Sequence, residues 1–217
     1  MYFIGIDLGT SSVKLIIIDE NGKIIKTTSR EYPLYFPQPS WSEQNPSDWW
    51  NETLNGLKEL LDGIDKSQVK GISYSGQMHG LVVLDKDDNV IRPAILWNDQ
   101  RTERECEYLN NEIGRDNLSK WTGNIALTGF TAPKILWLKE NELDNFKRIK
   151  KIMLPKDYLA YMMSGVFATD YSDASGTLYL DVKNKRWSRE MLDILGISIP
   201  QLPKLHESYE VIGNIKS

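Results

Sequence analysis

The stretch "YFIGIDLGTSSVKLIIIDENGKIIKTTSREY", residues Tyr2–Tyr32, decides the fold. Its first segment, Tyr2–Leu8, places apolar residues at alternate positions, which predicts a β-strand. A second strand is predicted at Val13–Asp19, and the dipeptide Asn21-Gly22 is a strong signal for a hairpin turn. This turn leads into a third antiparallel strand, Ile24–Tyr32. Three strands with no helix between them exclude a standard Rossmann opening, in which a helix follows the first strand.

The rest of the chain predicts a mixture of helices and strands. After a proline-rich loop, a helix is expected with Asn45 at its N-cap and Pro46 as its first residue. Its buried face is expected to consist of Trp50, Leu54, Leu57 and Leu61. Further strands are predicted at 69–75, 81–84, 151–154, 167–170 and 177–180, and further helices at about 101–112, 131–142, 158–163 and 188–195. This mixed order indicates an α/β fold.

Composition excludes several classes of protein. The chain has 217 residues, enough for one substantial domain or two small ones. A net charge of −4, with acidic and basic residues interspersed, argues against nucleic acid as a partner. The N-terminus lacks a basic signal-peptide segment, and the apolar run Leu15–Ile18 is too short to span a bilayer. A single cysteine, Cys106, favours a reducing compartment, so we expect a cytoplasmic protein without a membrane partner.

The first candidate site is the turn in "GIDLGTSSVK", residues Gly5–Lys14. Asp7 shares its strand face with two glycines, so little side-chain bulk crowds it, and it is a candidate for holding Mg²⁺ through water. The turn offers backbone N–H groups and side-chain donors that suit phosphate oxygens, from Thr10, Ser11, Ser12 and Lys14. An ordinary hairpin turn with a locally bonded aspartate is the alternative. The motifs of P-loop proteins and of protein kinases are missing from the sequence.

The second candidate site is the segment "SGQMHG". Gly76 and Gly80 permit backbone conformations or close approaches that other residues resist, so Met78 and His79 would be presented from a strand connection. A neutral His79 offers one hydrogen-bond donor and one acceptor, which suits sugar hydroxyls. The alternative is a buried histidine bonded to backbone, with the methionine filling a gap in the core.

The third candidate site is "ILWNDQR", which places Trp97, Asn98 and Asp99 after an apolar run. Ligands in open α/β sheets bind at such strand ends. An indole face beside amide and carboxylate groups is typical of carbohydrate sites. The alternative is that Asp99 caps the next helix while Trp97 fills the core. A zinc site is excluded, because His79 and His206 lie far apart in the sequence and there is only one cysteine.

Over all 217 residues the chain resembles the FGGY family of carbohydrate kinases. The resemblance rests on stretches that occur in the family's order: "GIDLGTSSVK", "WSEQNPSDWW", "SGQMHG", "ILWNDQR", "TGNIALTGFTAPKILWL", "LPKDYL" and "SDASGTLYLDV". The first is common to sugar kinases, whereas "GQMHG", "RPAILWND", "LPKDYL" and "SDASGT" together resemble the family's xylulose kinases. This resemblance implies a ribonuclease-H-like, actin-like ATPase domain. Its mixed sheet has three antiparallel opening strands, then parallel strands, and is flanked by helices.

The resemblance also implies an activity, namely transfer of a phosphoryl group from MgATP to the terminal hydroxyl of D-xylulose. By position, Asp7 is the carboxylate near Mg²⁺ and the transferring phosphate. The other roles that it implies are a phosphate-facing turn at Thr10, Ser11, Ser12 and Lys14, sugar contacts at Met78 and His79, and a sugar-pocket wall at Trp97, Asn98 and Asp99.

One departure from the family pattern concerns the general base. In the family it is an aspartate in a glycine-rich "GGGDN" stretch, which these 217 residues lack. We therefore expect residues 1–217 to be the N-terminal, sugar-binding domain, inactive without an ATP-binding second domain; a homodimer is compatible with the resemblance. Two alternatives stay open: a kinase for ribulose, gluconate or glycerol, since the Met78-His79 pair also occurs in gluconate-type relatives, or a non-catalytic actin-like domain.

Overall fold

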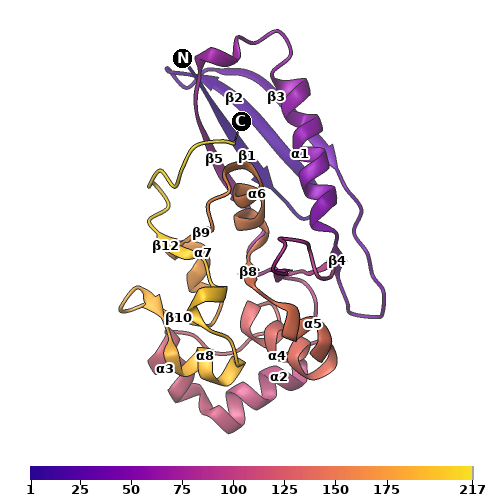
Figure 1. The fold of residues 1–217 in the computed structure, drawn as a ribbon, viewed down its shortest axis with the longest axis vertical. Coiled ribbons are helices and arrows are strands. Elements are labelled where there is room, and N and C mark those ends of the chain that lie inside the picture. The colour runs from indigo at the N-terminus through magenta and orange to yellow at the C-terminus, as the bar shows by residue number, and fades with distance from the viewer. Residues whose placement is uncertain (217) are drawn as a thin grey trace.

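The computed structural model describes residues 1–216, and Figure 1 shows their arrangement. The chain opens with three antiparallel strands, β1 (Tyr2–Leu8), β2 (Ser12–Asp19) and β3 (Ile24–Glu31), as predicted. β5 (Val69–Gly76) pairs in parallel with β1, so the strand order is β3-β2-β1-β5. The expected mixed sheet is confirmed, with β5 as the parallel strand of the main sheet among residues 1–216.

The register of this sheet brings three polar residues together. Asp7 on β1 lies opposite Lys14 on β2 and beside Ser75 on β5. The apolar residues Ile6 and Leu8, which flank Asp7, are buried. Because successive side chains on a strand point to opposite faces, Asp7 lies on the face away from the core.

Helix α1 (Pro46–Leu60) covers the buried face of the sheet (Figure 1). Asn45 is its N-cap and Pro46 its first residue, as predicted, although the Asn45 side chain makes no capping hydrogen bond. The predicted buried face is wrong by about one position. The most deeply buried positions are Trp49, Thr53, Gly56, Leu57 and Leu60, whereas Trp50, Leu54 and Leu61 are half-buried.

Gly56 explains this rotation of the helix. A Cβ atom at Gly56 would lie 2.6 Å from Cδ1 of Leu15, on the neighbouring strand β2. The missing side chain therefore lets the helix backbone approach the sheet at Gly56. A face defined by large apolar residues alone misses this contact, because it is made by a glycine.

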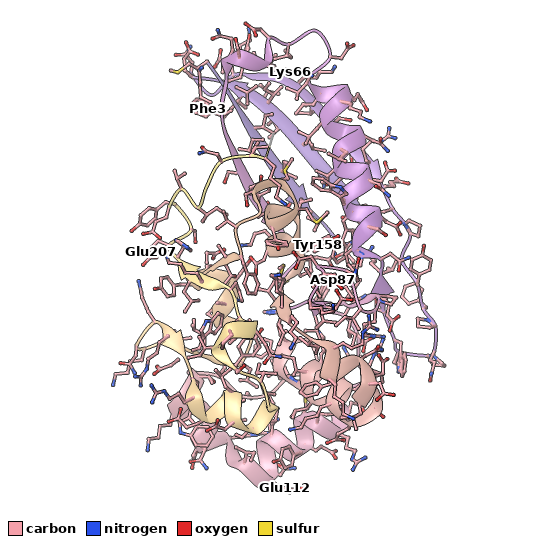
Figure 2. The ribbon with its side chains drawn as sticks, in the orientation of Figure 1. Phe3, Lys66, Asp87, Glu112, Tyr158 and Glu207 are labelled. Carbon is pink, nitrogen blue, oxygen red and sulfur yellow. The ribbon has the colours of Figure 1, made fainter. Side chains whose placement is uncertain are left out.

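The remaining elements that pack near the four-stranded sheet are shorter than α1. Helix α6 (Pro155–Ser164) packs against β5 and α1 and completes the hydrophobic core beside the sheet. Tyr158 on α6, labelled near the middle of the molecule in Figure 2, packs edge-on against Trp49 with ring centroids 6.4 Å apart. The short strands here are β4 (Glu43–Gln44), β6 (Val82–Leu84), β7 (Ala94–Ile95) and β8 (Lys151–Met153), and η1 spans Lys66–Gln68.

The lower half is mainly helical and has its own hydrophobic cluster (Figure 1). Its helices are α2 (Glu103–Glu107), α3 (Arg115–Thr122), α4 (Thr131–Asn141), α5 (Leu143–Arg148), α7 (Tyr171–Ser175) and α8 (Arg189–Leu195), with the 3₁₀ turn η3 (Ile199–Gln201). Its strands are β9 (Ala168–Asp170), β10 (Leu180–Asp181), β11 (Arg186–Trp187) and β12 (Lys204–His206). Among residues 1–216, no helix combines the length and apolar character that crossing a bilayer requires.

Two predicted elements of this half differ from the structure. The helix predicted at about 101–112 is confirmed in place, but its second half is the π-helical segment η2 (Tyr108–Gly114), and Gly114, with φ +95°, separates it from α3. The strand predicted at 177–180 is reduced to β10, which starts at Leu180. Thr177, the first residue of the predicted strand, instead donates its N–H to the carbonyl of Ala174 at the end of α7.

Candidate functional site

The carboxylate of Asp7 is exposed, two residues before the turn that joins β1 to β2. Its Oδ1 atom accepts a hydrogen bond of 2.8 Å from the Ser75 hydroxyl. Burial and then the charge of Asp7 raise the pKa of the Tyr32 phenol above its usual value, so Tyr32 stays protonated. A single exposed carboxylate fits Mg²⁺ held largely through water. Within residues 1–216, no group of three acidic, histidine or cysteine side chains could ligate a metal directly.

The turn between β1 and β2 has its carbonyl groups bonded inside the protein. The Gly9 carbonyl accepts from the Tyr32 hydroxyl at 2.5 Å, and the Thr10 carbonyl accepts from Gln44 Nε2 at 2.7 Å. The Ser11 carbonyl accepts from the Tyr32 N–H at 3.3 Å. The Gly9 N–H donates to the Ser12 carbonyl at 3.0 Å. Since carbonyl oxygens repel anions, their engagement favours an approach of phosphate to the hydroxyl groups and the other N–H groups of the turn, and the phosphate role of this turn stays a prediction.

Two buried glutamines connect this turn to the "SGQMHG" segment. Gln44 Oε1 accepts from Gln77 Nε2 and from Trp49 Nε1, each at 3.0 Å. The Gln77 N–H donates to the Leu8 carbonyl at 2.7 Å, one residue before the turn. Buried amides that are bonded in this way fix the position of the chain, so the turn and the segment form one rigid unit.

His79 carries the backbone strain of this segment. Its φ is +64°, and the Gly80 N–H donates to the Met78 carbonyl at 2.8 Å across it, the arrangement of a γ-turn. A residue other than glycine in this region costs about 1–3 kcal/mol and persists only where its surroundings hold it. Gly76 and Gly80 have no positive φ, and a Cβ at Gly80 would lie 2.6 Å from Pro155. The glycines therefore serve close packing here.

The His79 ring is half-buried and closely surrounded. It packs on the Phe130 ring with centroids 4.9 Å apart, and a Cβ at Gly176 would lie 2.2 Å from its Cε1. Its Nδ1 atom is buried and has no hydrogen-bond partner among residues 1–216. Burial and then the charge of Lys134 lower the pKa of His79, so its neutral form, with one donor and one acceptor, dominates at neutral pH. Met78, the neighbouring residue, is 45% exposed.

The Trp97 segment faces the phosphate turn. Trp97 is 42% exposed, so it does not fill the core, and its Nε1 donates to Thr10 Oγ1 at 3.0 Å. Asn98 is half-buried, and its Oδ1 atom lacks a hydrogen-bond partner inside the protein. Asp99 does not cap the next helix, because the N-cap of α2 is Thr102. Trp97 thus presents an exposed indole face that could meet a sugar, whereas the Oδ1 atom of Asn98 is buried.

Asp99 is fully buried, in contrast to its two neighbours. Its Oδ2 atom accepts from Arg101 Nη2 at 2.7 Å and from the Ser42 N–H at 2.6 Å, and its Oδ1 accepts from Arg101 Nε. The Arg101 guanidinium lies 3.7 Å from the Trp41 ring centroid and 4.8 Å from that of Trp137. Both carboxylate oxygens are thus occupied, which gives Asp99 a supporting position in place of the direct sugar contact expected from its sequence neighbours.

The structure brings the phosphate turn, the His79 turn and the Trp97 segment together at one site. Sequence reasoning gave no role to several residues that connect them, namely Gln44, Gln77, Gly129, Phe130, Lys134 and Gly176. They lie inside the stretches that carry the family resemblance, which was the available signal. No spacing rule links them, because their contacts join segments that are distant in the sequence.

Comparisons with known proteins show the family of this chain. Residues 2–217 match the family model of the N-terminal domain of the FGGY family of carbohydrate kinases. The chain is 48% identical over 216 residues to the xylulose kinase of Bacillus subtilis (strain 168), covering 99% of this chain and 43% of that relative. The crystal structure of a "xyloylose kinase" from Brucella ovis superposes with a TM-score of 0.96 at 41% identity, covering all of this chain and 46% of the other.

A crystal structure of a gluconate kinase from Lactobacillus acidophilus is also similar, with a TM-score of 0.94, 31% identity, and coverage of 100% and 44% of the two chains. This chain therefore spans less than half the length of the relatives that it matches. The match extends over almost the entire sequence and includes each of the three segments of the site. The chain belongs to the FGGY family of carbohydrate kinases, as the resemblance of its motifs implies.

Proposed function

We propose that these residues form the sugar-binding half of a xylulose kinase, which transfers the terminal phosphoryl group of MgATP to D-xylulose. The observation that carries this proposal is the 3.0 Å hydrogen bond from Trp97 to Thr10, which joins a sugar-type surface to a phosphate-type turn. A kinase needs both surfaces within one site, because catalysis of phosphoryl transfer consists mostly of positioning and electrostatic stabilisation. The similarity to xylulose kinases supports the choice of sugar.

On the sugar side, each residue has a role that its surroundings favour. The exposed faces of Met78 and Trp97 would contact the C–H surface of the sugar. The neutral imidazole of His79 and the amide group of Asn98, which is half-buried beside Trp97, would bond its hydroxyl groups. Asp99 would act indirectly, since its buried pair with Arg101 holds the segment that carries Trp97 and Asn98.

On the phosphate side, Asp7 would orient the metal through water, and Lys14, directly opposite it, would supply positive charge. The turn residues Thr10, Ser11 and Ser12 would bond phosphate oxygens. Bound Mg²⁺ supplies charge neutralisation of the transferring group. In this proposal the general base lies outside these 217 residues, because the sequence has no "GGGDN" stretch.

A gluconate kinase is the second candidate. The similarity to the gluconate kinase of Lactobacillus acidophilus, at 31% identity, favours it. Gluconate carries a carboxylate, which would require a cation at the end of its pocket. The higher identity to xylulose kinases favours the sugar over the acid. Cys106, buried and unpaired, agrees with action in the cytoplasm, the compartment that we propose.

Assays of two proteins side by side test this proposal. We expect the complete protein that contains these residues to release ADP from MgATP only when D-xylulose is present. Residues 1–217 alone should show no measurable turnover, because they contribute half of the positioning and no base. An Asp7→Asn variant of the complete protein should lose activity by orders of magnitude while it still unfolds at the temperature of the unaltered protein. Robust turnover by residues 1–217 would contradict the assignment of the base to another part of the protein.

A further inference from the structure

The carbonyl group of His79 is the point at which the strained turn is held. The Thr131 hydroxyl donates to it at 3.2 Å, and the Lys134 ammonium donates to it at 3.0 Å. Both donors lie in the first turn of α4, more than 50 residues away in sequence. A left-handed residue other than glycine needs such external restraint to keep its conformation.

Lys134 binds a second loop at the same time. Its Nζ donates to the Gly129 carbonyl at 2.6 Å, just before the start of α4. Gly129 in turn packs against the Trp97 segment, since a Cβ there would lie 2.9 Å from the Trp97 carbonyl oxygen. Phe130, the next residue, packs on the His79 ring. The single ammonium group of Lys134 therefore connects both sugar-facing segments.

Lys134 has no exposed surface, which is unusual for a lysine. The titratable and charged groups around it are Asp99, Arg101, Cys106 and His79. Asp99 is already paired with Arg101, and the Lys134 ammonium donates its hydrogen bonds to two carbonyl groups. Burying a lysine without a salt bridge of its own costs free energy. An apolar side chain at the same position would pack this face of the helix without that cost.

We propose that Lys134 is a positioning residue, which sets the places of His79 and Trp97 in the sugar site by bonding the His79 and Gly129 carbonyls. This inference rests on the proposed function, because it assumes that these two segments bind the sugar. Lys134 does not touch the sugar in this account. It acts through the backbone of the γ-turn, and its loss releases that turn from the left-handed conformation.

The test compares variants of the complete protein with matched controls. Lys134→Met keeps the length of the side chain and removes its donors, and Thr131→Val keeps the shape of its side chain and removes the second donor to His79. Lys139→Met is the control, since it makes the same change on the same helix, at a residue whose amine lies near Gly196. The measurements are KM for D-xylulose, KM for ATP, kcat, and a crystal structure of Lys134→Met.

We expect Lys134→Met to raise KM for D-xylulose at least ten-fold and to change KM for ATP less than two-fold. Thr131→Val should raise the sugar KM by two- to five-fold, and Lys139→Met should change neither constant. In the crystal structure of Lys134→Met, φ at His79 should leave the left-handed region. If Lys134→Met does not fold, the result of Thr131→Val decides in its place.

An unchanged sugar KM in both variants, or an unchanged His79 turn in the Lys134→Met crystal structure, would overturn the inference. A protein in which Lys134 were merely part of the core would lose thermal stability without this split between the two KM values. Failure of the proposed function gives a different result. In that case the unaltered protein does not phosphorylate D-xylulose, and the crystal structure still decides whether Lys134 holds the turn.

Discussion

Replacing Gly176 by alanine tests whether activity depends on the exact position of the His79 imidazole, which packs against Gly176. A Cβ atom at Gly176 would lie 2.2 Å from Cε1 and 2.6 Å from Nδ1 of His79. Carbon atoms in contact are separated by about 3.5–4.0 Å, so the ring would have to withdraw by about 1 Å or more. The backbone at Gly176 has φ −85°, which alanine adopts without strain, so the effect of the substitution is steric.

The expected loss follows from this displacement. A shift of about 1 Å in a positioning group can cost about 100-fold in rate. We therefore expect kcat/KM for D-xylulose to fall about 100-fold in Gly176→Ala, which corresponds to about 2.7 kcal/mol of lost transition-state stabilisation. KM for ATP should stay within two-fold, because His79 lies on the sugar side. The assay is ADP release by the complete protein, coupled to oxidation of NADH.

Gly71→Ala is the matched control for this prediction. Gly71 lies on β5, and a Cβ there would meet only the ring edge of Phe3, at 3.4 Å, which is an ordinary contact. We expect its kcat/KM to equal that of the unaltered protein. A Gly176→Ala variant with kcat/KM within two-fold of the unaltered value would refute the claim that the seat of His79 determines sugar binding.

Three further predictions concern stability and reactivity. Arg101→Met leaves Asp99 without its charged partner, while Glu43 keeps its ion pair with Arg92, and should cost about 3–5 kcal/mol, seen as a lower Tm, whereas an unchanged Tm would contradict a supporting role for the Asp99–Arg101 pair. Burial raises the pKa of Cys106 to about 11, so a disulfide reagent at pH 8 should modify it only after unfolding, and fast reaction of the native protein would contradict its burial. Burial lowers the pKa of Lys134 from 10.5 to about 7, so the unfolded chain binds more protons than the folded protein between these two pH values. The free energy of unfolding, measured by urea titration, should therefore rise with pH relative to that of Lys134→Met, by up to about 1.4 kcal/mol per pH unit. A difference between the two proteins that stays constant with pH would contradict the shift.

Sequence patterns predict correctly those strands and turns whose structure depends on neighbouring residues. The hairpin of β1 and β2 and the turn at Asn21-Gly22 follow from alternation and from turn chemistry, and both agree with the structure. Helix α1 was predicted with its N-terminus at Pro46, but its buried face was misplaced. Side-chain size indicated Trp50, whereas the close approach at Gly56 turned Trp49 inward. A glycine contact of this kind depends on the partner strand, and the helix sequence does not contain it.

The features of the site also fall into two groups, those that local sequence patterns predict and those that depend on the tertiary fold. The positions of His79 and Trp97 at chain connections, and of Asp7 just before one, can be read from the sequence, because glycines and turn residues mark these connections. The seat of the His79 ring against Gly176 and the hold of Lys134 on its carbonyl could not. These contacts join residues that are tens of positions apart, and no periodicity records them.

The buried state of Asp99 is the other result that the sequence did not predict. An aspartate beside a tryptophan and an asparagine fits a sugar site equally well whether it faces the ligand or the core. Its partner, Arg101, is only two residues away, but the sequence does not show that the rings of Trp41 and Trp137 both lie against the guanidinium. These aromatic rings shield the ion pair from water, and that shielding depends on the tertiary fold.

The most direct test of the central claim is the specificity of the complete protein toward a panel of sugars. The panel should contain D-xylulose, D-ribulose, gluconate and glycerol, with MgATP held at saturation and kcat/KM measured for each from ADP release. We expect D-xylulose to have the highest kcat/KM of the panel, at least ten-fold above the others. A much higher value for gluconate or glycerol, or the absence of phosphorylation of every compound, would contradict it.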